Sequence, residues 1–589
     1  MGMVRYHGYY PQWAIYDRNF LLRDLDQNGT AAQLTVLNYA FANISSNTKV
    51  HPGYKAFAAT APNRNPGHAD GSKDVGDAEA DWGRPFTAEQ SVDGKADPGY
   101  WGDAKYLKGN FNQLRKLKAK HPHLKVLISI GGWTYSRNFS EAAKPANREA
   151  FVKSFIDLYI KGNLPTEVWT DTDNYPKQMM KTFGGPGAAA GIFDGIDIDW
   201  EWPGCDAGLP GNIHHQDDKK NLPLLLKEFR DQLDALPSRS DGSKYLLTAF
   251  IPADPKVIEA GWDVKEVMKH LDYGNLQGYD LRGPFGGADD LVTNHQSALH
   301  LIKADPNPKK LSVETAVDAW VKAGAPPEKI VMGIPFYSRG WQGVQNDASG
   351  GLFQKAGGPV AKGKGKGQAK YEPGVNEYRD LAGLDKAGYT LHRDDPNGVA
   401  WLYSSSEKVF WTFDDPMAVY LKAKFAKTKG LAGAMAYSLD GDDKAGGVLT
   451  RHIRAALEGK EPPTKQPPLE NACDAPAWNK AYVYTKKNRV THKGELWQGA
   501  FWSQGTEPGT ANSDGAHPWK KVKSCTLPIR IKLPEGARKW TNTVAYDTGD
   551  YVYVDGDLYT AAWKIPAGHP DKPGENESTW QPMGRYEKV

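Results

Sequence analysis

Three carboxylates alternate with apolar residues in one short segment, and their spacing suits acid–base chemistry. Alternate side chains of a strand share a face, so Asp197, Asp199 and Glu201 are expected to point one way, with neighbouring carboxyls roughly 6.5 Å apart. The two isoleucines and the tryptophan between them point the other way. Buried carboxylates lose hydration and repel one another, which raises the pKa of a terminal glutamate toward neutral. Such a glutamate can protonate a leaving oxygen and then, as a base, activate a water molecule.

Two other interpretations of this segment are a metal site and a solvated acidic edge. A Mg²⁺ or Ca²⁺ site takes ligands from several elements, often with loop carbonyls, whereas here three acids follow one strand. A solvated edge would not alternate with large apolar residues. We therefore interpret the three acids as catalytic, and we predict no metal and no cofactor.

The elements that must hold this segment form a repeating pattern over residues 1–458. Short β-rich runs alternate with stretches of helical periodicity, such as Phe111–Lys120 and Leu222–Leu236. Eight such runs predict an α/β fold, a parallel (β/α)8 TIM barrel, with a doubly wound sheet as the alternative. The predicted strands are Val4–Tyr10, Leu34–Ala42, Lys125–Ile130, Gly191–Glu201, Leu246–Ile251, Tyr273–Tyr279, Lys329–Tyr337 and Leu431–Leu439.

Further regions interrupt or follow the barrel. Residues 338–410, with aromatic strands and a Gly-Lys loop, are predicted to form an α+β insertion between strands seven and eight. Residues 459–472 contain four prolines and predict a linker. Beyond it, 473–525 and 537–589 look alike, are joined by 526–536, and each predicts a small all-β module. These modules hold seven of the 19 tryptophans, more than such small cores require, so some rings are expected at the surface.

The composition excludes several classes of partner. The 589 residues carry 73 basic and 70 acidic side chains, a net charge of +3, without the concentrated basic charge that nucleic-acid binding requires. No apolar run reaches the ~20 residues of a membrane helix. We therefore expect no nucleic acid and no membrane as partners, and a monomer.

The cysteines and the first residues bear on the compartment. Cys473 and Cys525 bracket the first C-terminal module, and a disulfide between them would stabilise it by roughly 4 kcal/mol. The sequence opens on Met1-Gly2-Met3 and enters a strand at once, without a charged and apolar leader. The protein is therefore either cytosolic or secreted with its signal peptide already removed, and we favour secretion.

Four motifs, in order, resemble those of the family 18 glycoside hydrolases. The segment Asp194–Glu201 matches the family pattern DxxDxDxE, and Ser129–Trp133 matches SxGG. Downstream, Gln277–Asp280 resembles the strand-six element, and Met332–Arg339 resembles the strand-seven element MGxPxYGR. The similarity runs from residue 4 to about residue 455.

The resemblance implies a role for each matching residue. Glu201 would be the acid and then the base, and Asp199 would stabilise the substrate's acetamido group, whose carbonyl attacks the anomeric carbon in this family. Asp197 would lie behind Asp199 and hold a shared proton, Tyr279 would hold the acetamido oxygen, and Asp280 would contact the sugar. Further substrate contacts or supports are implied for Tyr9, Phe41, Ser129, Trp133, Gln277, Phe285 and Arg339.

One position departs from the family pattern. The eighth strand of relatives usually ends in Met-x-Trp, whose indole stacks under the distorted sugar, whereas this chain has Tyr437 there. A phenol offers a smaller aromatic face. We expect Tyr437 to form the floor of the site, with a role in core packing as the alternative.

The two C-terminal modules resemble the carbohydrate-binding modules of families 5 and 12. Phe501-Trp502 and Ala562-Trp563 resemble the aromatic hairpin of these modules, whose pattern Tyr/Trp-x-Ala-x-Trp is present in the second as Tyr559-x-Ala561-x-Trp563. Flat rings stack on sugar faces without needing charge. The closing tryptophans, Trp519 and Trp580, are expected in the cores. Chitin binding is implied for Trp478, Phe501, Trp502, Trp540 and Trp563.

Together these features imply a retaining, secreted chitinase that acts on chitin and chitooligosaccharides. One alternative is an endo-β-N-acetylglucosaminidase that acts on N-glycans, which shares the family motif. The two chitin-type modules argue against it. The other is a chitin-binding lectin of the same fold. Such lectins characteristically lose the terminal glutamate, and this chain keeps Glu201.

Overall fold

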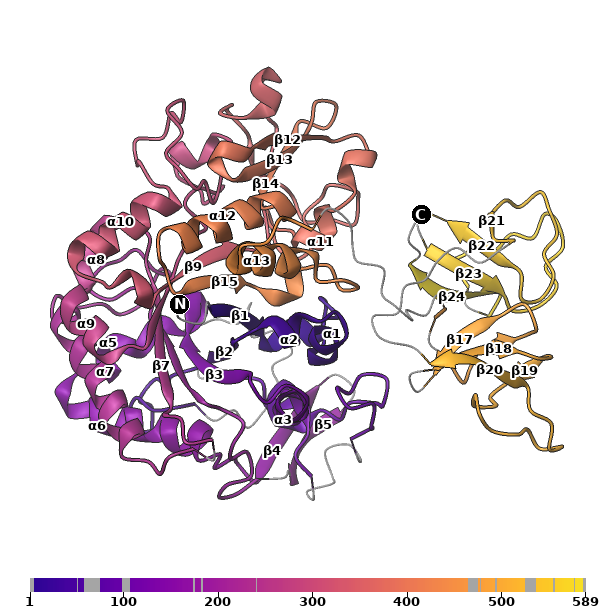
Figure 1. Cartoon of the computed structure of the whole chain (residues 1–589), viewed down its shortest axis with the longest axis horizontal. Coiled ribbons are helices and arrows are strands. Elements are labelled where there is room, and N and C mark those ends of the chain that lie inside the picture. The colour runs from indigo at the N-terminus through magenta and orange to yellow at the C-terminus, as the bar shows by residue number, and fades with distance from the viewer. Residues whose placement is uncertain are drawn as a thin grey trace. The chain divides into compact units, whose positions relative to one another are not determined.

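The computed structural model describes residues 5–49, 51–57, 75–97, 106–172, 175–181, 184–239, 241–463, 475–476, 478–492, 495–524, 536–554, 557–576 and 578–585 (Figure 1). The chain divides into two compact units, Met1–Thr464 and Lys465–Val589. Each unit is described by itself.

The first unit is built on a closed barrel of eight parallel strands, which confirms the predicted TIM barrel (Figure 1). Around the barrel the strands follow the order β1-β15-β9-β8-β7-β6-β3-β2. Every barrel strand overlaps one of the eight predicted runs. The strands are β1 (Arg5–Pro11), β2 (Val36–Ala42), β3 (Lys125–Gly131), β6 (Gly195–Asp199), β7 (Leu246–Ile251), β8 (Tyr273–Leu276), β9 (Ile330–Pro335) and β15 (Gly433–Tyr437).

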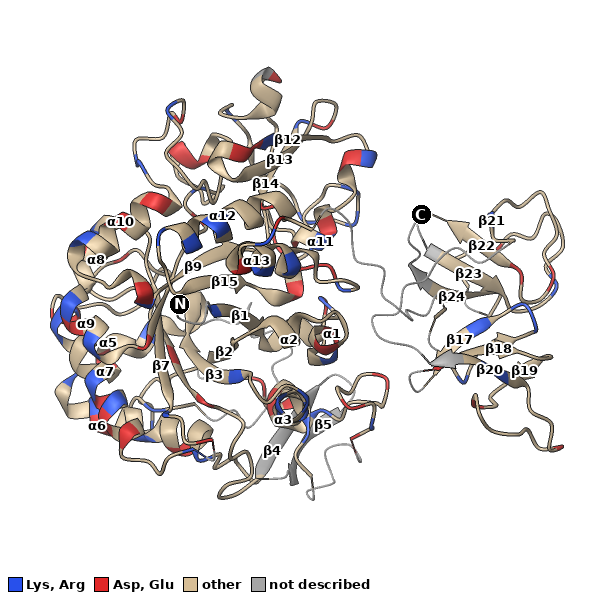
Figure 2. Cartoon of the chain, in the orientation of Figure 1, with Lys and Arg blue, Asp and Glu red and all other residues tan. Residues whose placement is uncertain are grey.

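Helices surround the barrel (Figure 1). Their charged residues of both signs lie on the outer faces, as on α6, α7 and α9 (Figure 2). No helix among the described residues is long and apolar enough to span a membrane. The helices are α1 (Leu22–Gln27), α2 (Thr30–Gln33), α3 (Gly109–Lys120), α4 (Gly132–Tyr135), α5 (Phe139–Ala142), α6 (Pro145–Phe155), α7 (Asp218–Asp234), α8 (Pro255–Gly261), α9 (Val264–His270), α10 (Val313–Ala323), α11 (Tyr378–Leu381), α12 (Pro416–Thr428) and α13 (Val448–Glu458).

Local sequence signals fix the ends of these helices, as α10 illustrates. The hydroxyl of Ser312 accepts a hydrogen bond from the backbone N–H of Thr315 at the helix start. The helix ends at Gly324, whose φ of 109° is a left-handed conformation that glycine adopts without a Cβ penalty. Buried Val313, Val317 and Trp320 then face the barrel core.

Two additions interrupt the barrel. A hairpin of β4 (Glu167–Thr172) and β5 (Tyr175–Lys181) precedes β6. The predicted insertion lies between β9 and β15 and contains a five-stranded antiparallel sheet of order β11-β10-β14-β13-β12. Its last strand in the chain ends at Phe413, three residues beyond the predicted boundary. The sheet consists of β10 (Arg339–Gln342), β11 (Gly358–Pro359), β12 (Thr390–Asp394), β13 (Val399–Ser404) and β14 (Val409–Phe413).

The second unit is all-β, and its two halves repeat one internal arrangement. Tyr484 packs edge-on against Trp519 with ring centroids 5.1 Å apart, and Tyr546 packs against Trp580 at the same distance. Both tryptophans are buried, which confirms their predicted place in the cores. The predicted disulfide, Cys473 with Cys525, lies outside the described residues. The strands are β16 (Val483–Tyr484), β17 (Arg489–His492), β18 (Glu495–Gly499), β19 (Ser503–Gln504), β20 (Trp519–Ser524), β21 (Arg538–Lys539), β22 (Tyr551–Val554), β23 (Asp557–Ala561) and β24 (Trp580–Arg585).

Candidate active site

Asp197 lies inside the barrel, fully buried, and receives hydrogen bonds from four strands. Tyr9 Oη and Ser129 Oγ donate to its Oδ2 over 2.7 and 2.8 Å. Thr248 Oγ1 and Asn275 Nδ2 donate to its Oδ1, the latter over 3.1 Å. Burial raises the pKa of Asp197, and these bonds oppose the rise. Four donors occupy the four lone-pair sites of a carboxylate, so the protein itself fills every accepting position of Asp197.

A buried histidine fixes the orientation of one of these donors. His7 Nδ1 lies 2.9 Å from Asn275 Oδ1, and because an amide oxygen only accepts, Nδ1 carries the proton. Burial lowers the pKa of His7 to about 4, so its ring is neutral near pH 7. The amide nitrogen of Asn275 is thereby turned toward Asp197. The sequence analysis missed His7, Thr248 and Asn275, although each is a polar residue inside a predicted barrel strand.

Asp199 and Glu201 are the other two acids of the segment. Asp199 is buried and Glu201 is partly exposed, and their side chains share a hydrogen bond. Burial and the mutual repulsion of the carboxylates raise the pKa of Asp199, and burial together with the charge of Asp280 raises that of Glu201. A hydrogen bond between two carboxyls requires a proton. The oxygens of Asp197 already accept four bonds, and the expectation that Asp197 holds a shared proton stays a prediction.

The backbone around this pair is held from neighbouring elements. Ser136 Oγ accepts the Glu201 backbone N–H over 2.9 Å, and Asn212 Nδ2 donates to the Glu201 carbonyl over 3.0 Å. A Cβ on Gly131 would lie 2.2 Å from the Asp199 carbonyl oxygen, and one on Gly132 would lie 2.7 Å from the Phe41 ring. Gly131 therefore allows the end of β3 to pass close to β6, and Gly132 allows it to pass close to Phe41 on β2.

Asp194, the first acid of the family pattern, does not belong to this site. Its Oδ2 accepts the backbone N–H of Val126 over 2.7 Å, and its Oδ1 forms ion pairs with Lys118 and Arg239. It precedes β6, whereas Glu201 follows the other end of that strand. Asp194 thus ties the start of the strand to its neighbours.

Tyr279 and Tyr437 lie together at the carboxyl end of the barrel. The Tyr279 ring is buried, and its centroid lies 5.7 Å from that of Tyr437 and 6.1 Å from that of Phe250. The Tyr437 ring is partly exposed and lies 5.5 Å from that of Tyr9. Tyr437 is therefore adjacent to residues that surround the three acids, and its role as the floor of the site stays a prediction.

A further carboxylate at this end of the barrel, Asp280, is held by residues of the strand-seven motif. Asp280 accepts hydrogen bonds from Tyr337 Oη and Arg339 Nε, both over 2.7 Å. The Arg339 guanidinium also lies 5.1 Å from the ring centroid of Phe285. Arg339 opens the insertion, so the insertion sheet and the barrel share this network.

The remaining residues predicted to contact substrate are near the same end of the barrel. Trp133, in α4 directly after β3, and Phe285 are about half exposed, at 48% and 54%. Gln277 is partly buried and accepts the backbone N–H of Ala253 over 3.3 Å. Phe41 packs 6.1 Å from Trp13, a partly exposed ring that the sequence analysis missed.

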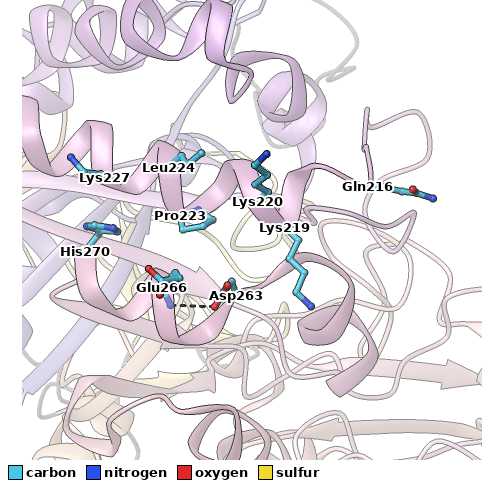
Figure 3. A pocket seen from close by; sticks show the side chains of 9 residues that line it. All are labelled: Gln216, Lys219, Lys220, Pro223, Leu224, Lys227, Asp263, Glu266 and His270. Carbon is cyan, nitrogen blue, oxygen red and sulfur yellow. Dashed lines mark hydrogen bonds between the residues drawn. The ribbon is translucent and has the colours of Figure 1, made fainter.

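A separate hollow lies on the outer surface between α7 and α9 (Figure 3). Its lining includes Pro223 and Leu224 flanked by charges of both signs, such as Lys219 and Asp263. None of the catalytic residues lines it. Among the described residues, no group of three or more histidine, cysteine or acidic side chains is placed to hold a metal ion.

The closed parallel barrel, with Asp197 and Asp199 on its fourth strand along the chain and Glu201 just beyond that strand, defines a class of protein. The family model described as "Glycosyl hydrolases family 18" matches residues 5–442, and the chain belongs to this family.

The chain is 33% identical over 480 residues to "Chitinase A1" of Niallia circulans and 32% identical over 451 residues to "Chitinase C" of Streptomyces lividans. These matches cover 77% and 76% of this chain but only 59% and 58% of the two relatives. Among solved structures, the catalytic domain of psychrophilic chitinase B from Arthrobacter TAD20 has a TM-score of 0.66 and 40% identity, and the match covers 79% of this chain and 98% of that domain.

The charge of Asp280 provides a test of the acid–base assignment by pH. Asp280 raises the pKa of Glu201, so Asp280→Asn is expected to lower it. Glu201 must be protonated to act as an acid, and the alkaline limb of the kcat/KM profile should therefore move to lower pH, by about one unit. The measurement is the pH dependence of kcat/KM on a soluble chitooligosaccharide. Exposed Asp206→Asn is the control, and an unchanged or upward-shifted limb in Asp280→Asn would contradict the assignment.

Proposed function

We propose that this chain is a chitinase that hydrolyses β-1,4-linked N-acetylglucosamine polymers with retention of configuration, using the substrate's acetamido group as the nucleophile. The observation that carries the proposal is a pair of buried polar atoms without a hydrogen-bond partner, Asp199 Oδ1 and Tyr279 Oη.

These two atoms have complementary requirements. A carboxylate oxygen accepts a hydrogen bond and a phenol donates one. A buried polar group left without a partner costs roughly 1–3 kcal/mol. An acetamido group offers an N–H and a carbonyl oxygen at a fixed spacing, and would satisfy Asp199 and Tyr279 together. A neutral sugar without an N-acetyl group offers no such pair.

The proposed reaction follows from these positions. Glu201 donates its proton to the glycosidic oxygen while the acetamido oxygen attacks the anomeric carbon, which breaks the glycosidic bond and forms a cyclic oxazolinium ion. The negative charge of Asp199 stabilises the cation through the acetamido N–H. Glu201, now a carboxylate, takes a proton from water, whose oxygen attacks the same carbon and opens the ring. Two displacements on one carbon retain its configuration.

The defining experiment is hydrolysis of the N-acetylglucosamine hexamer with the anomer of the first product read by NMR. We expect the β-anomer first, and no cleavage of the fully deacetylated hexamer, which lacks the nucleophile. Cleavage of a high-mannose N-glycan instead would identify an endo-β-N-acetylglucosaminidase, and binding without turnover would identify a lectin. Because an insoluble polymer cannot enter a cell, the proposal includes action outside the cell.

The role of Tyr437 is testable by comparing kinetics with stability. If its ring supports the bound sugar, Tyr437→Ala should lower kcat/KM on chitooligosaccharides more than it lowers the melting temperature. Tyr437→Trp should change kcat or KM by a few-fold, since aromatic contacts contribute roughly 0.5–1.5 kcal/mol beyond area. A large loss of melting temperature in Tyr437→Trp with unchanged kinetics per folded molecule would instead assign the ring to core packing.

The C-terminal residues are proposed to bind chitin and to act by holding the enzyme at the polymer surface. Deletion of 470–589 should leave hydrolysis of the soluble hexamer within about two-fold and lower the rate on particulate chitin, an effect of local concentration. Initial rates on both substrates, per folded molecule, measure this. Equal loss on both would mean that these residues stabilise the barrel.

A further inference from the structure

The two halves of the C-terminal unit contact each other through equivalent positions. A shift of 62 positions superimposes the halves in sequence and aligns Tyr484 with Tyr546 and Leu496 with Leu558. Both tyrosines bond the backbone five residues earlier in the same way, through Asn479 and Thr541. The halves are therefore structural repeats as well as similar sequences.

The contacts between the repeats are reciprocal. Lys487 Nζ forms an ion pair with Asp550, and Asn488 Nδ2 donates to the Gly549 carbonyl over 3.3 Å. Under the shift, Gly549 is the equivalent of Lys487, and Asp550 is the equivalent of Asn488. Both contacts therefore join the same two positions of the repeat, and the two repeats exchange places between one contact and the other. Such exchange is the property of an interface with two-fold symmetry.

The contact at the centre of this symmetry joins a position to its own equivalent. The backbone N–H of Arg489 donates to Tyr551 Oη over 3.3 Å, and Tyr551 is the residue that the shift aligns with Arg489. The turns also pack closely, since a Cβ on Gly549 would lie 2.3 Å from Thr485 Oγ1. Fully buried Asn488 accepts the Thr485 N–H and donates across the interface, so the interface satisfies its polar atoms.

The apolar core is shared between the repeats as well. Tyr484, Val490 and Trp519 of the first repeat form one buried cluster with Tyr551, Leu558 and Met583 of the second. A separate cluster is built from second-repeat residues alone, among them Ile565. Repeats of about 45–50 residues bury little apolar surface by themselves. The first repeat therefore depends on the second for part of its core.

Large aromatic side chains remain exposed on both repeats. Phe501 is 40% exposed, and Trp563, its equivalent under the shift, is also 40% exposed. Trp502, next to Phe501, is 60% exposed. By contrast, Trp478 and Trp540, which the sequence analysis assigned to chitin binding, are partly buried and pack against the cores. The exposed rings thus lie at matching positions of two repeats that are fixed to each other.

We propose that residues 478–585 act as one bivalent body that grips a chitin surface through two aromatic sites at once, Phe501 with Trp502 and, on the other repeat, Trp563. The proposal rests on the proposed function. Two sites on a rigid body convert the second contact into an intramolecular event, which raises avidity by about 10²–10⁴-fold without any new contact. A surface that displays many chain segments can occupy both sites, whereas a short soluble oligosaccharide occupies one. The partner is therefore particulate chitin in preference to soluble chains.

The first test measures the dissociation constant on particulate α-chitin, using the full chain with Glu201→Gln so that the particle is not consumed. Loss of either site removes the avidity, so Trp502→Ala and Trp563→Ala should each weaken binding at least ten-fold. If the two sites act separately, each single variant should bind particulate chitin only about two-fold more weakly than the parent chain. That result would overturn the proposal. The matched control is Val522→Ala, which trims a 45%-exposed side chain of the same unit and should change nothing.

The second test measures hydrogen exchange in β17 and β18 of the first repeat. Met583→Ala removes a second-repeat side chain from the shared cluster and should speed exchange in the first repeat. Ile565→Ala, in the cluster of the second repeat alone, should act mainly on the second repeat. Unchanged exchange of β17 and β18 in Met583→Ala would show that the repeats are independent. Hydrolysis of the soluble hexamer by the wild-type chain tests the proposed function separately, because it does not depend on either outcome.

Discussion

Glu201→Gln is expected to lower kcat on the N-acetylglucosamine hexamer by about 10²–10⁴-fold while leaving the affinity for the hexamer within a few-fold. Proton transfer by a positioned carboxyl contributes an effect of this size, and an amide of the same shape cannot exchange a proton. Glu201 is the partly exposed member of the reactive pair, and its raised pKa keeps it protonated in the free enzyme near neutral pH. Single-turnover rates and binding isotherms on the hexamer measure the two quantities.

The matched control for this substitution is Asp206→Asn, an exposed acid five residues further along the chain. It should retain wild-type kcat, because its carboxyl faces solvent. Retention of more than a tenth of wild-type kcat by Glu201→Gln would remove Glu201 from the role of acid and base.

The barrel and its catalytic strand could be predicted because their signals are local. Apolar β-rich runs separated by helical periodicity locate strands, and all eight barrel strands overlap the predicted runs. The alternation of acids with apolar residues on β6 likewise follows from strand geometry. In the structure Ile196 and Ile198 pack in the outer core, and Asp197 lies inside among polar donors. The predicted strand over Gly191–Glu201 was too long, because β6 spans Gly195–Asp199 and the chain leaves it before Glu201.

Two of the four residues that bond Asp197 could not be identified in the same way, whereas the family resemblance implied Tyr9 and Ser129 as its supports. Thr248 and Asn275 come from β7 and β8, and they meet Asp197 only because the barrel closes with a particular register. A polar residue inside a strand is a weak signal alone, since its partner depends on neighbours across the sheet.

The C-terminal unit shows a similar limit. Motif similarity located two repeats, but it did not separate exposed from core aromatic residues, and Trp478 and Trp540 turn out to be partly buried. The residue types in the turns likewise do not predict the ion pair between Lys487 and Asp550. Contacts between equivalent residues of two repeats become visible only when both repeats are placed in space.

Asp199→Asn is expected to lower kcat by about 10²–10³-fold, with a smaller change in KM. Asparagine keeps the size of the side chain and one accepting oxygen, so the acetamido N–H can still be bound. It lacks the negative charge that stabilises the oxazolinium ion, and a charge-assisted hydrogen bond is roughly twice as strong as a neutral one. Groups placed at developing charge in a water-excluded site contribute effects of this magnitude to kcat. Rates on the hexamer, divided into kcat and KM, give the result.

The same substitution at the other end of the strand provides the control for that prediction. Asp194→Asn removes a carboxylate that pairs with Lys118 and Arg239 and lies just before β6, at the end of that strand opposite Glu201. It leaves two cations without their buried partner, so the melting temperature should fall, whereas kcat per folded molecule should stay within a few-fold of wild type. Asp199→Asn should show the opposite pattern, with a large loss of kcat and little loss of stability, because Asp199 has an unpartnered oxygen and no ion pair to lose. Two outcomes would contradict this prediction: an equal loss of kcat in both variants, or a kcat of Asp199→Asn within ten-fold of wild type. Either would show that the charge of Asp199 does not act on the reaction and that another group in the site stabilises the cation.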